Sequence, residues 1–455
     1  MKKWFILPGL FLLSLASFSQ QDDSVFIRRL ADEILLRGHA YEDLRVLTKQ
    51  IGGRLAGSPQ MVKAEQWGLQ TLQALRPDRA WLQECTVPHW VRGGQDMATA
   101  RMKNGQSKTL DVLALGNSEG SGPQGVMGDV IEVRSFDELK EKKDLVKDKI
   151  VFYNYRFRQE LVKTFEAYGD AVRYRSSGAS MAAQYGARGV IVRSMSESTD
   201  NIPHTGSLRY DSAYARIPAV AVGLQDADWL DATLATQSLN VTIKTNGHFL
   251  PDTIGHNVIA ELKGTEFPDQ YITIGGHLDS WDPAEGAHDD GAGVVQTIEV
   301  LRALKAMGYK PKRTIRFVLF ANEENGLRGG TKYASEAQAR GERHIFALES
   351  DEGGFTPRGF SLTGSEEQYG KLASWQPLLC PYGGCEMLRG GGGSDIGPLN
   401  RTQKTPTAGF SPDSQRYFDL HHARNDVFEA VNRRELELGA VNIAALVYLV
   451  DKYGF

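Results

Sequence analysis

Acidic and histidine side chains gather in five short segments of the C-terminal half of the chain. The segments are 276–280 (GHLDS), 288–291 (HDDG), 321–326 (ANEENG), 349–354 (ESDEGG) and 420–426 (LHHARND). Each alone is weak evidence, because Asp-Asp-Gly most often forms a turn and paired glutamates usually lie on a solvated face. Together, so many carboxylates and imidazoles would repel one another unless cations held them. Carboxylate and imidazole ligands without a thiolate suit zinc, and less well manganese or cobalt.

Five side chains of these segments are predicted to ligate a pair of metal ions. Such a centre needs about five ligating side chains, one of them a carboxylate that bridges the ions. The predicted ligands are His277, Asp289, Glu324, Asp351 and one of His421 and His422. Glu323 is then the spare carboxylate, which would take a proton from the attacking water and pass it to the leaving amine. Asp279 is predicted to accept the imidazole N–H of His277 and so to orient the ring.

The same segments stand next to predicted strands and helices. Apolar periodicity predicts strands at 271–275, 314–320 and 345–348, and helices at 293–307 and 433–452. Strands that alternate with helices indicate an α/β fold with a mostly parallel, mixed sheet covered by helices on both faces. In such sheets the ligand site lies beyond the carboxyl ends of the strands. The five segments are therefore expected to meet at one edge of the sheet.

The first half of the chain shows two different sequence patterns. Residues 24–75 have apolar residues at helical spacing, with a loop at 51–59 in which Ser58 can cap the next helix. Residues 90–252 instead contain short β-branched runs separated by Gly, Asp and Asn, with one helical patch around 180–185, and they hold no metal-ligand constellation. We predict an α/β domain formed by 20–92 and 253–455, which carries the predicted zinc ligands, with a β-rich insertion at 93–252.

Composition and the N-terminus bound the class of protein. The net charge of −4 argues against a nucleic-acid partner, and 41% hydrophobic with 24% charged residues excludes disordered and collagen-like chains. Two lysines before an apolar stretch at 4–16 predict a signal peptide over 1–19, with an uncleaved anchor or a buried helix as the alternative. The mature protein is then secreted or periplasmic and has no membrane span. Cys380 and Cys385 can close a small loop, and Cys85 is expected to be a buried free thiol.

With these residues the chain resembles the co-catalytic zinc exopeptidases, a family that includes bacterial leucyl aminopeptidase and carboxypeptidase Q. The motifs that carry the resemblance are GHLD at 276–279, DDG at 289–291, Glu323 with Glu324, Asp351, and the closing His-x-x-x-Asp. The tracts NVIA at 257–260, GGGGSD at 390–395 and RLAGS at 54–58 favour the carboxypeptidase Q group. The likeness covers nearly all of the mature chain, and the insertion resembles a protease-associated domain.

The resemblance implies roles for the predicted ligands. His277 and Asp351 would hold opposite metal ions, or share them with Asp289 as the bridge. Glu324 would complete the site, and Glu323 would be the general base. The resemblance also implies two Zn²⁺ ions for each chain and a homodimer.

Two further expectations come from the family pattern. The peptide bond at 289–290 is expected in the rare cis form. The His-x-x-x-Asp spacing, counted back from Asp426, selects His422 over His421 as the last ligand. Ala423 departs from the pattern, because family members usually carry Thr or Ser there.

The predicted function is that of a secreted two-zinc exopeptidase that hydrolyses dipeptides or the terminal residue of short peptides, with a metal-activated water as nucleophile. The alternatives are a single-zinc glutaminyl cyclase, which the same fold supports, and a peptide-binding module without catalysis; the full ligand set argues against both. Substrate contacts are predicted at Ser394, Tyr417 and Arg389, since an arginine can pair with a substrate carboxylate. Ordinary surface-loop positions are the competing interpretation for these three.

Overall fold

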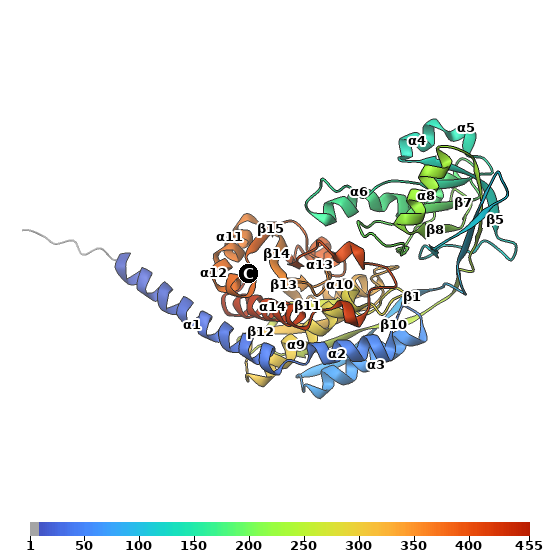
Figure 1. Ribbon diagram of the computed structural model, residues 1–455. Coiled ribbons are helices and arrows are strands. Elements are labelled where there is room, and N and C mark those ends of the chain that lie inside the picture. The colour runs from blue at the N-terminus through green and yellow to red at the C-terminus, as the bar shows by residue number, and fades with distance from the viewer. Residues whose placement is uncertain (1–8) are drawn as a thin grey trace, which may run out of the picture.

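The computed structural model describes residues 9–455 (Figure 1). The leader predicted at 1–19 lies partly outside this range, and from Gly9 to Arg37 the chain forms helix α1. None of the helices in the described range combines the length and the apolar character that a membrane span requires.

One eight-stranded sheet, the first sheet, carries the predicted metal ligands at its edge. Its strand order is β1-β10-β12-β11-β13-β16-β14-β15. The strands are β1 (Arg79–Val91), β10 (His248–Leu262), β11 (Phe267–His277), β12 (Arg313–Phe320), β13 (Arg343–Glu349), β14 (Pro357–Thr363), β15 (Glu386–Arg389) and β16 (Thr407–Pro412). The central neighbours β12, β11, β13 and β16 are parallel, and β10 joins antiparallel to β12. The predicted mixed α/β sheet is therefore confirmed.

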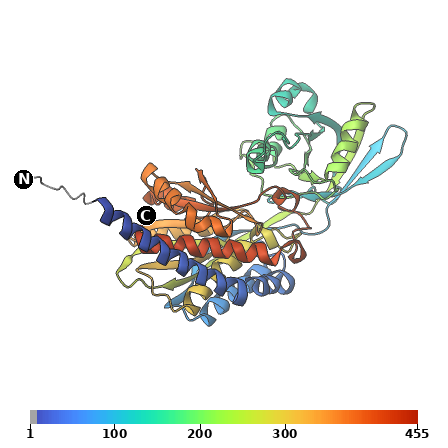
Figure 2. The ribbon, with the colours of Figure 1, turned by 60° about the vertical axis from the view of Figure 1, so that its left-hand side comes forward.

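The central strands are apolar on both sides because helices cover both faces of the first sheet. In β12 every residue after Arg313 is buried, as expected for a parallel strand enclosed by helices. One face is covered by α1, α2 (Ala40–Val46), α3 (Pro59–Ala74), α9 (Ala292–Ala306) and α14 (Arg433–Tyr453). The other face is covered by α10 (Arg328–Ala339) and α13 (Gly397–Gln403). Figure 2 shows α14 running beside α1.

The helix boundaries follow local sequence signals. Ser58 caps α3 by accepting a hydrogen bond from the Met61 N–H at 3.1 Å, as predicted, and Pro59 occupies the first turn. Helix α9 is followed by Gly308, whose positive φ of 64° suits glycine. Asn432 caps α14 by accepting from the N–H groups of Arg434 and Glu435.

A second eight-stranded sheet, with the order β3-β2-β9-β5-β6-β7-β8-β4, lies between β1 and β10 in the sequence. Its strands are β2 (Met97–Met102), β3 (Ser107–Leu110), β4 (Val112–Ala114), β5 (Val126–Val133), β6 (Ile150–Tyr153), β7 (Gly189–Arg193), β8 (Ala219–Val222) and β9 (Leu239–Lys244). Figures 1 and 2 show it to one side of the first sheet, reached through β1 and β10.

The region around the second sheet is more helical than its sequence suggests. Helices α6 (Thr164–Ser176) and α7 (Gly178–Ala183) cover one face, and α8 (Leu224–Leu234) covers the other. The sequence indicated only a helical patch near α7. Helix α6 was missed because it contains Gly169 and several weak helix formers, and it is stabilised by the burial of Ala167, Ala171 and Tyr174.

The cysteines match the pairing considered from their spacing. Cys380 and Cys385 form a disulfide, and Cys85 is a buried free thiol.

Candidate metal centre

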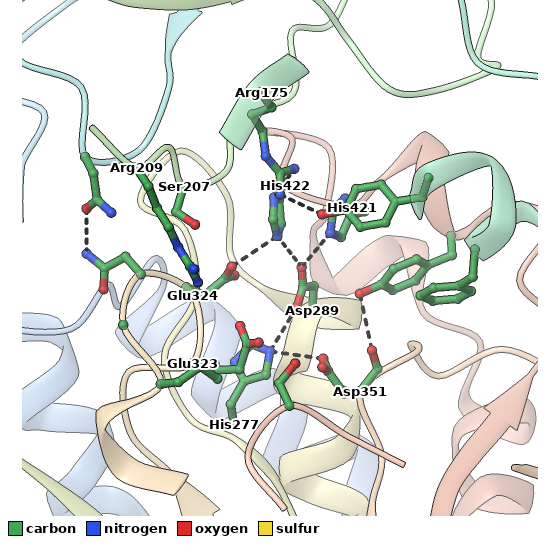
Figure 3. Close-up of a pocket in the computed structure, with 18 residues that line it drawn as sticks. Arg175, Ser207, Arg209, His277, Asp289, Glu323, Glu324, Asp351, His421 and His422 are labelled. Carbon is green, nitrogen blue, oxygen red and sulfur yellow. Dashed lines mark hydrogen bonds and ion pairs between the residues drawn. The ribbon is translucent and has the colours of Figure 1, made fainter. Parts of the chain in front are cut away.

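Asp289 stands between two groups of ligand atoms. On one side, the His277 Nε2 atom lies 3.1 Å from Asp289 Oδ1 and 3.1 Å from Asp351 Oδ1. On the other side, the His422 Nε2 atom lies 3.2 Å from Asp289 Oδ2 and 3.0 Å from Glu324 Oε2. The two oxygens of one carboxylate thus face different imidazoles (Figure 3). His277 and Asp351 lie on the same side of Asp289, which favours the alternative in which they share an ion with Asp289 over the one in which they hold opposite ions.

The edge of the first sheet brings these residues together. His277 is the last residue of β11, Asp351 follows the end of β13 at Glu349, and Glu324 follows the end of β12 at Phe320. Because parallel strands end at the same edge, residues far apart in the sequence meet here. Asp289 lies in the segment Ala287–Gly291, directly before α9.

Buried hydrogen bonds fix the segment that carries Asp289. The peptide bond between Asp289 and Asp290 is cis, as the resemblance implied. The Asp290 carboxylate accepts from the His277 N–H and the Gly293 N–H, both at 2.9 Å. It therefore ties the end of β11 to the start of α9. A Cβ at Gly276 would lie 2.4 Å from Asp290 Oδ2, so only glycine fits that position.

Two residues outside the ligand set hold the loops on either side. The buried Asp426 carboxylate accepts from the N–H groups of His288 at 2.8 Å and Asp289 at 3.1 Å. The fully buried Arg54 guanidinium donates to the carbonyls of Leu278, Glu285 and Gly286. Sequence analysis placed both in motifs without assigning them this role, because their partners are backbone atoms.

Asp279 acts differently from the prediction. The His277 Nδ1 atom lies 3.0 Å from the backbone carbonyl of Asp279 and 3.8 Å from its carboxylate. The carboxylate instead accepts from the N–H groups of Glu323 at 3.0 Å and Glu324 at 3.3 Å. Because the chain turns after β11, the carbonyl faces the ring while the side chain holds the turn that carries both glutamates.

Burial makes the ionised carboxylates of the cluster costly. Burial and the neighbouring Asp289 raise the pKa of Glu324 to about 8. Burial, together with the other acids of the site, raises the pKa of Asp351 to about 6. Burial alone would lower the pKa of His422, but Glu324 and Asp289 raise it to about 10. The chain thus supplies too little positive charge for these acids.

The donor atoms fit divalent cations. Glu324 Oε1 has no hydrogen-bond partner among the described residues, and the contact of Asp289 Oδ2 with His422 lacks hydrogen-bond geometry. Three overlapping groups of His, Asp and Glu have ligand atoms within 4.8 Å of one another. Each side of Asp289 offers one imidazole and carboxylate oxygens, a set suited to zinc.

Distances favour His422 over His421 as the predicted last ligand. The His421 Nε2 atom lies 3.8 Å from Asp289 Oδ2, farther than that of His422. The two rings stack with their centroids 3.5 Å apart. His422 alone also reaches Glu324.

A cavity of about 480 Å³ opens onto these ligands. Ser394 and Tyr417, two of the predicted substrate contacts, line it, and so does Glu323. Arg389 does not line the cavity. It lies on the outermost strand of the first sheet, where its guanidinium pairs with Glu366 and covers the ring of Tyr369 at 3.9 Å.

The arginines that do line the cavity are Arg175 and Arg209, which belong to the region of the second sheet. No sequence motif points to them, because that region contains no ligand motif. The packing of α6 and of the loop at 205–217 against the segment at 414–422 brings them to the ligands.

The chain is similar to known peptidases over most of its length. Residues 257–447 match peptidase family M28. Carboxypeptidase Q of Homo sapiens is 33% identical over 419 residues, which cover 92% of this chain and 85% of that protein. Carboxypeptidase Q of Xenopus laevis is 32% identical over 434 residues, with 95% and 90% covered.

Solved structures agree with the fold. The crystal structure of a peptidase M28 precursor from Shewanella amazonensis superposes with a TM-score of 0.89 at 32% identity, covering 95% of this chain and 97% of that one. A zinc aminopeptidase from Bacillus subtilis has a TM-score of 0.65 at 21% identity, with 90% and 94% covered, and supports the fold alone.

Proposed function

The chain belongs to peptidase family M28 and is a metallopeptidase, and we propose that it is a two-zinc exopeptidase that hydrolyses dipeptides or the terminal residue of short peptides. One observation carries the proposal: the two oxygens of Asp289 face two separate groups of ligands. A single bridging carboxylate between two imidazoles is what a pair of divalent cations needs.

The chain's residues divide between the two ions. His277, Asp351 and Asp289 would hold one, and His422, Glu324 and Asp289 would hold the other. When bound, the two ions would polarise the scissile carbonyl and lower the pKa of a water. Asp289, whose two carboxylate oxygens face the two groups, would help to hold both ions.

Glu323 would move the proton. Its side chain lines the cavity and points in beside His277 (Figure 3). The described residues give its carboxylate neither an ion pair nor a hydrogen bond, while its backbone N–H is fixed by Asp279. A carboxylate that is positioned and unoccupied in this way can accept the proton of the attacking water and donate it to the leaving amine.

The size of the cavity supports a short substrate. About 480 Å³ lies toward the small end of ligand pockets. Residues from both sheet regions line it, which limits the length of peptide that can enter.

The test is the zinc content of the purified protein together with turnover of small peptides. About two zinc ions for each chain, and dipeptide cleavage that chelation abolishes and zinc restores, would support the proposal. One zinc ion with cyclisation of N-terminal glutamine would support the cyclase, and zinc-free protein without turnover would support the binding module.

The remaining expectations are part of the same proposal. We assign the zinc domain to 20–92 and 253–455 and the protease-associated-like insertion to 93–252, supported by the strands of the second sheet, which all lie between Met97 and Lys244. We also propose signal-peptide cleavage near residue 19, export from the cytoplasm and a homodimer. N-terminal sequencing of the exported protein and light scattering would test these points.

A further inference from the structure

The last predicted ligand, His422, contacts backbone atoms of the second-sheet region. Thr205, in the loop that precedes β8, donates its N–H to the His422 carbonyl at 3.0 Å, and the Thr205 carbonyl lies 3.3 Å from His422 Nδ1. The other ring nitrogen, Nε2, faces Glu324 and Asp289 (Figure 3). The imidazole therefore stands between the carboxylates of the metal centre and a backbone carbonyl of the second-sheet region.

The neighbouring His204 holds the residue that precedes the ligand. Its Nδ1 atom lies 2.8 Å from the His421 carbonyl, and because a carbonyl only accepts, this nitrogen carries the hydrogen and donates it. The His204 ring is 4% exposed, and burial lowers its pKa to about 4, which keeps it neutral at pH 7. His204 therefore contacts the ligand-bearing segment as one fixed tautomer.

The second sheet anchors both of these residues. The His204 N–H donates to the Ser194 hydroxyl at 2.9 Å, and that hydroxyl donates to the carbonyl of Val222, the last residue of β8. The Thr205 hydroxyl donates at 2.8 Å to the carbonyl of Ala114, the last residue of β4. The position of the last ligand is thus linked to strands of the second sheet.

The backbone at Gly206 comes close to the imidazole of His422. A Cβ at Gly206 would lie 2.6 Å from His422 Nδ1, and the φ of 130° is one that side chains rarely adopt, so only glycine fits. His422 itself has a φ of 61°, which is uncommon for a residue other than glycine and persists only when the surroundings hold it. The bonds from His204 and Thr205 flank this strained residue.

The Thr205 carbonyl is suited to orient a metal-ligating imidazole. Ligation through Nε2 leaves the hydrogen of the His422 ring on Nδ1, and that hydrogen needs an acceptor. Arg175 Nη1 also lies 3.3 Å from Nδ1, but a guanidinium only donates. Among the contacts that the described residues make with Nδ1, the Thr205 carbonyl is therefore the acceptor. Such an acceptor fixes the ring and raises its basicity as a ligand.

We propose that the segment at 204–206 holds His422 in the orientation that binds an ion, so that this one of the two ion sites depends on the second-sheet region. His204 is a positioning residue, since it acts on the ion through the backbone of the His421–His422 segment. The site at His277 has no such dependence, because its Nδ1 atom faces the Asp279 carbonyl within the first-sheet region. The inference rests on the two ion sites of the proposed function.

The test measures zinc affinity at each site in wild type and in His204→Phe, which keeps a ring and removes its N–H. Crystals equilibrated at a series of buffered free zinc concentrations, with data collected at the zinc edge, give the occupancy beside His422 and beside His277 separately. The affinity beside His422 should fall by about 10- to 100-fold, the usual effect of losing a residue that orients a metal ligand. The affinity beside His277 should not change.

Two further variants and a control sharpen the result. His204→Asn places an amide N–H near the position of the lost imidazole N–H, and it should keep the affinity beside His422 close to that of wild type. Gly206→Ala brings a methyl group against the His422 ring and should weaken the same site as His204→Phe. The matched control is Tyr153→Phe, which removes a buried 2.9 Å hydrogen bond to the Gly178 carbonyl within the second-sheet region and should change neither site.

Two results would overturn the inference. One is wild-type zinc affinity beside His422 in both His204→Phe and Gly206→Ala. The other is an equal loss of affinity beside His422 and His277, which general destabilisation of the fold would produce.

Failure of the proposed function gives a different pattern. If wild type binds a single ion beside His422, and His204→Phe weakens it, the two-zinc proposal fails and the positioning role stands. If wild type binds two ions and both variants match it, the positioning role alone fails. An ion found only beside His277, or no ion, would overturn both.

Discussion

Two charge clusters lie at opposite ends of strand β12, and they shift the pKa values of their glutamates in opposite directions. Near the start of the strand, the Arg316 guanidinium pairs with Glu261 at 2.9 Å and with Glu342 at 2.5 Å. Burial alone would raise the pKa of Glu342, but His344 and Arg316 lower it to about 2. Beyond the end of the strand, at the candidate metal centre, the pKa of Glu324 is raised to about 8.

The pKa values differ because the negative charge of the carboxylates is compensated differently in the two clusters. The acids of the Arg316 cluster have a cationic partner within the chain, whereas those of the metal centre outnumber the chain's own cations. A compensated cluster supports the fold, and an uncompensated one needs charge from outside. Replacing residues in each cluster should therefore produce different defects, one in stability and one in metal content and turnover.

The largest effect is expected from Asp289, the residue proposed to hold both ions. Asp289→Ala should lose most of its zinc and reduce turnover to background, because the bridge is removed from both groups of ligands. Elemental analysis and peptide assays on the same preparation would measure this. A variant that kept two zinc ions would contradict the bridging role.

The second-largest effect is expected from Glu323, the proposed general base. Glu323→Gln should lower kcat by about 100- to 10,000-fold, the usual contribution of general acid–base catalysis. It should retain the zinc content and melting temperature of wild type, because Glu323 is not a ligand. Glu367→Gln, an exposed glutamate, is the matched control. Near-normal kcat in Glu323→Gln would assign the proton transfer elsewhere.

Disrupting the Arg316 cluster should reduce stability rather than metal content. Arg316→Met should cost about 3–5 kcal/mol of unfolding free energy, because it removes the guanidinium that pairs with the largely enclosed carboxylates of Glu261 and Glu342. Zinc content should be unchanged. Urea unfolding would measure the loss, with Arg188→Met as the control, since Arg188 forms an exposed pair with Asp148 worth about 0–1 kcal/mol. Loss of zinc in Arg316→Met would remove the distinction between the clusters.

The smallest effect is a pH dependence of stability. Because the pKa of Glu342 is lowered from 4.5 to about 2, its contribution is present above about pH 4.5 and is lost as pH falls toward 2. Glu342→Gln should therefore cost about 2 kcal/mol relative to wild type at pH 7 and less at pH 3.5. Urea unfolding of both proteins at each pH would measure the gap. A gap that widened at low pH would reverse the sign.

How far the sequence predicts this site depends on whether a residue's partners are local. Four predicted ligands could be grouped from the sequence because each stands at or just after the end of a central strand, or just before a helix: His277, Asp289, Glu324 and Asp351. The role of Asp279 could not, because the turn after β11 decides whether its carbonyl or its carboxylate faces the ring.

That Arg175 and Arg209 line the cavity could not be predicted from the sequence, for a different reason. Arg389 stood in a glycine-rich tract near the last ligand, but β15 lies at the outer edge of the sheet. Arg175 and Arg209 lie in a region without motifs and reach the cavity through packing between the two sheet regions. Short polar motifs specify the metal centre, whereas the substrate side depends on long-range packing that they do not encode.

Anomalous X-ray scattering at the zinc edge, from crystals of the zinc-loaded protein, would show directly whether Asp289 holds two ions. We expect two peaks flanking Asp289, one beside His277 and Asp351 and the other beside His422 and Glu324. A single peak, or two peaks that do not share Asp289, would contradict it.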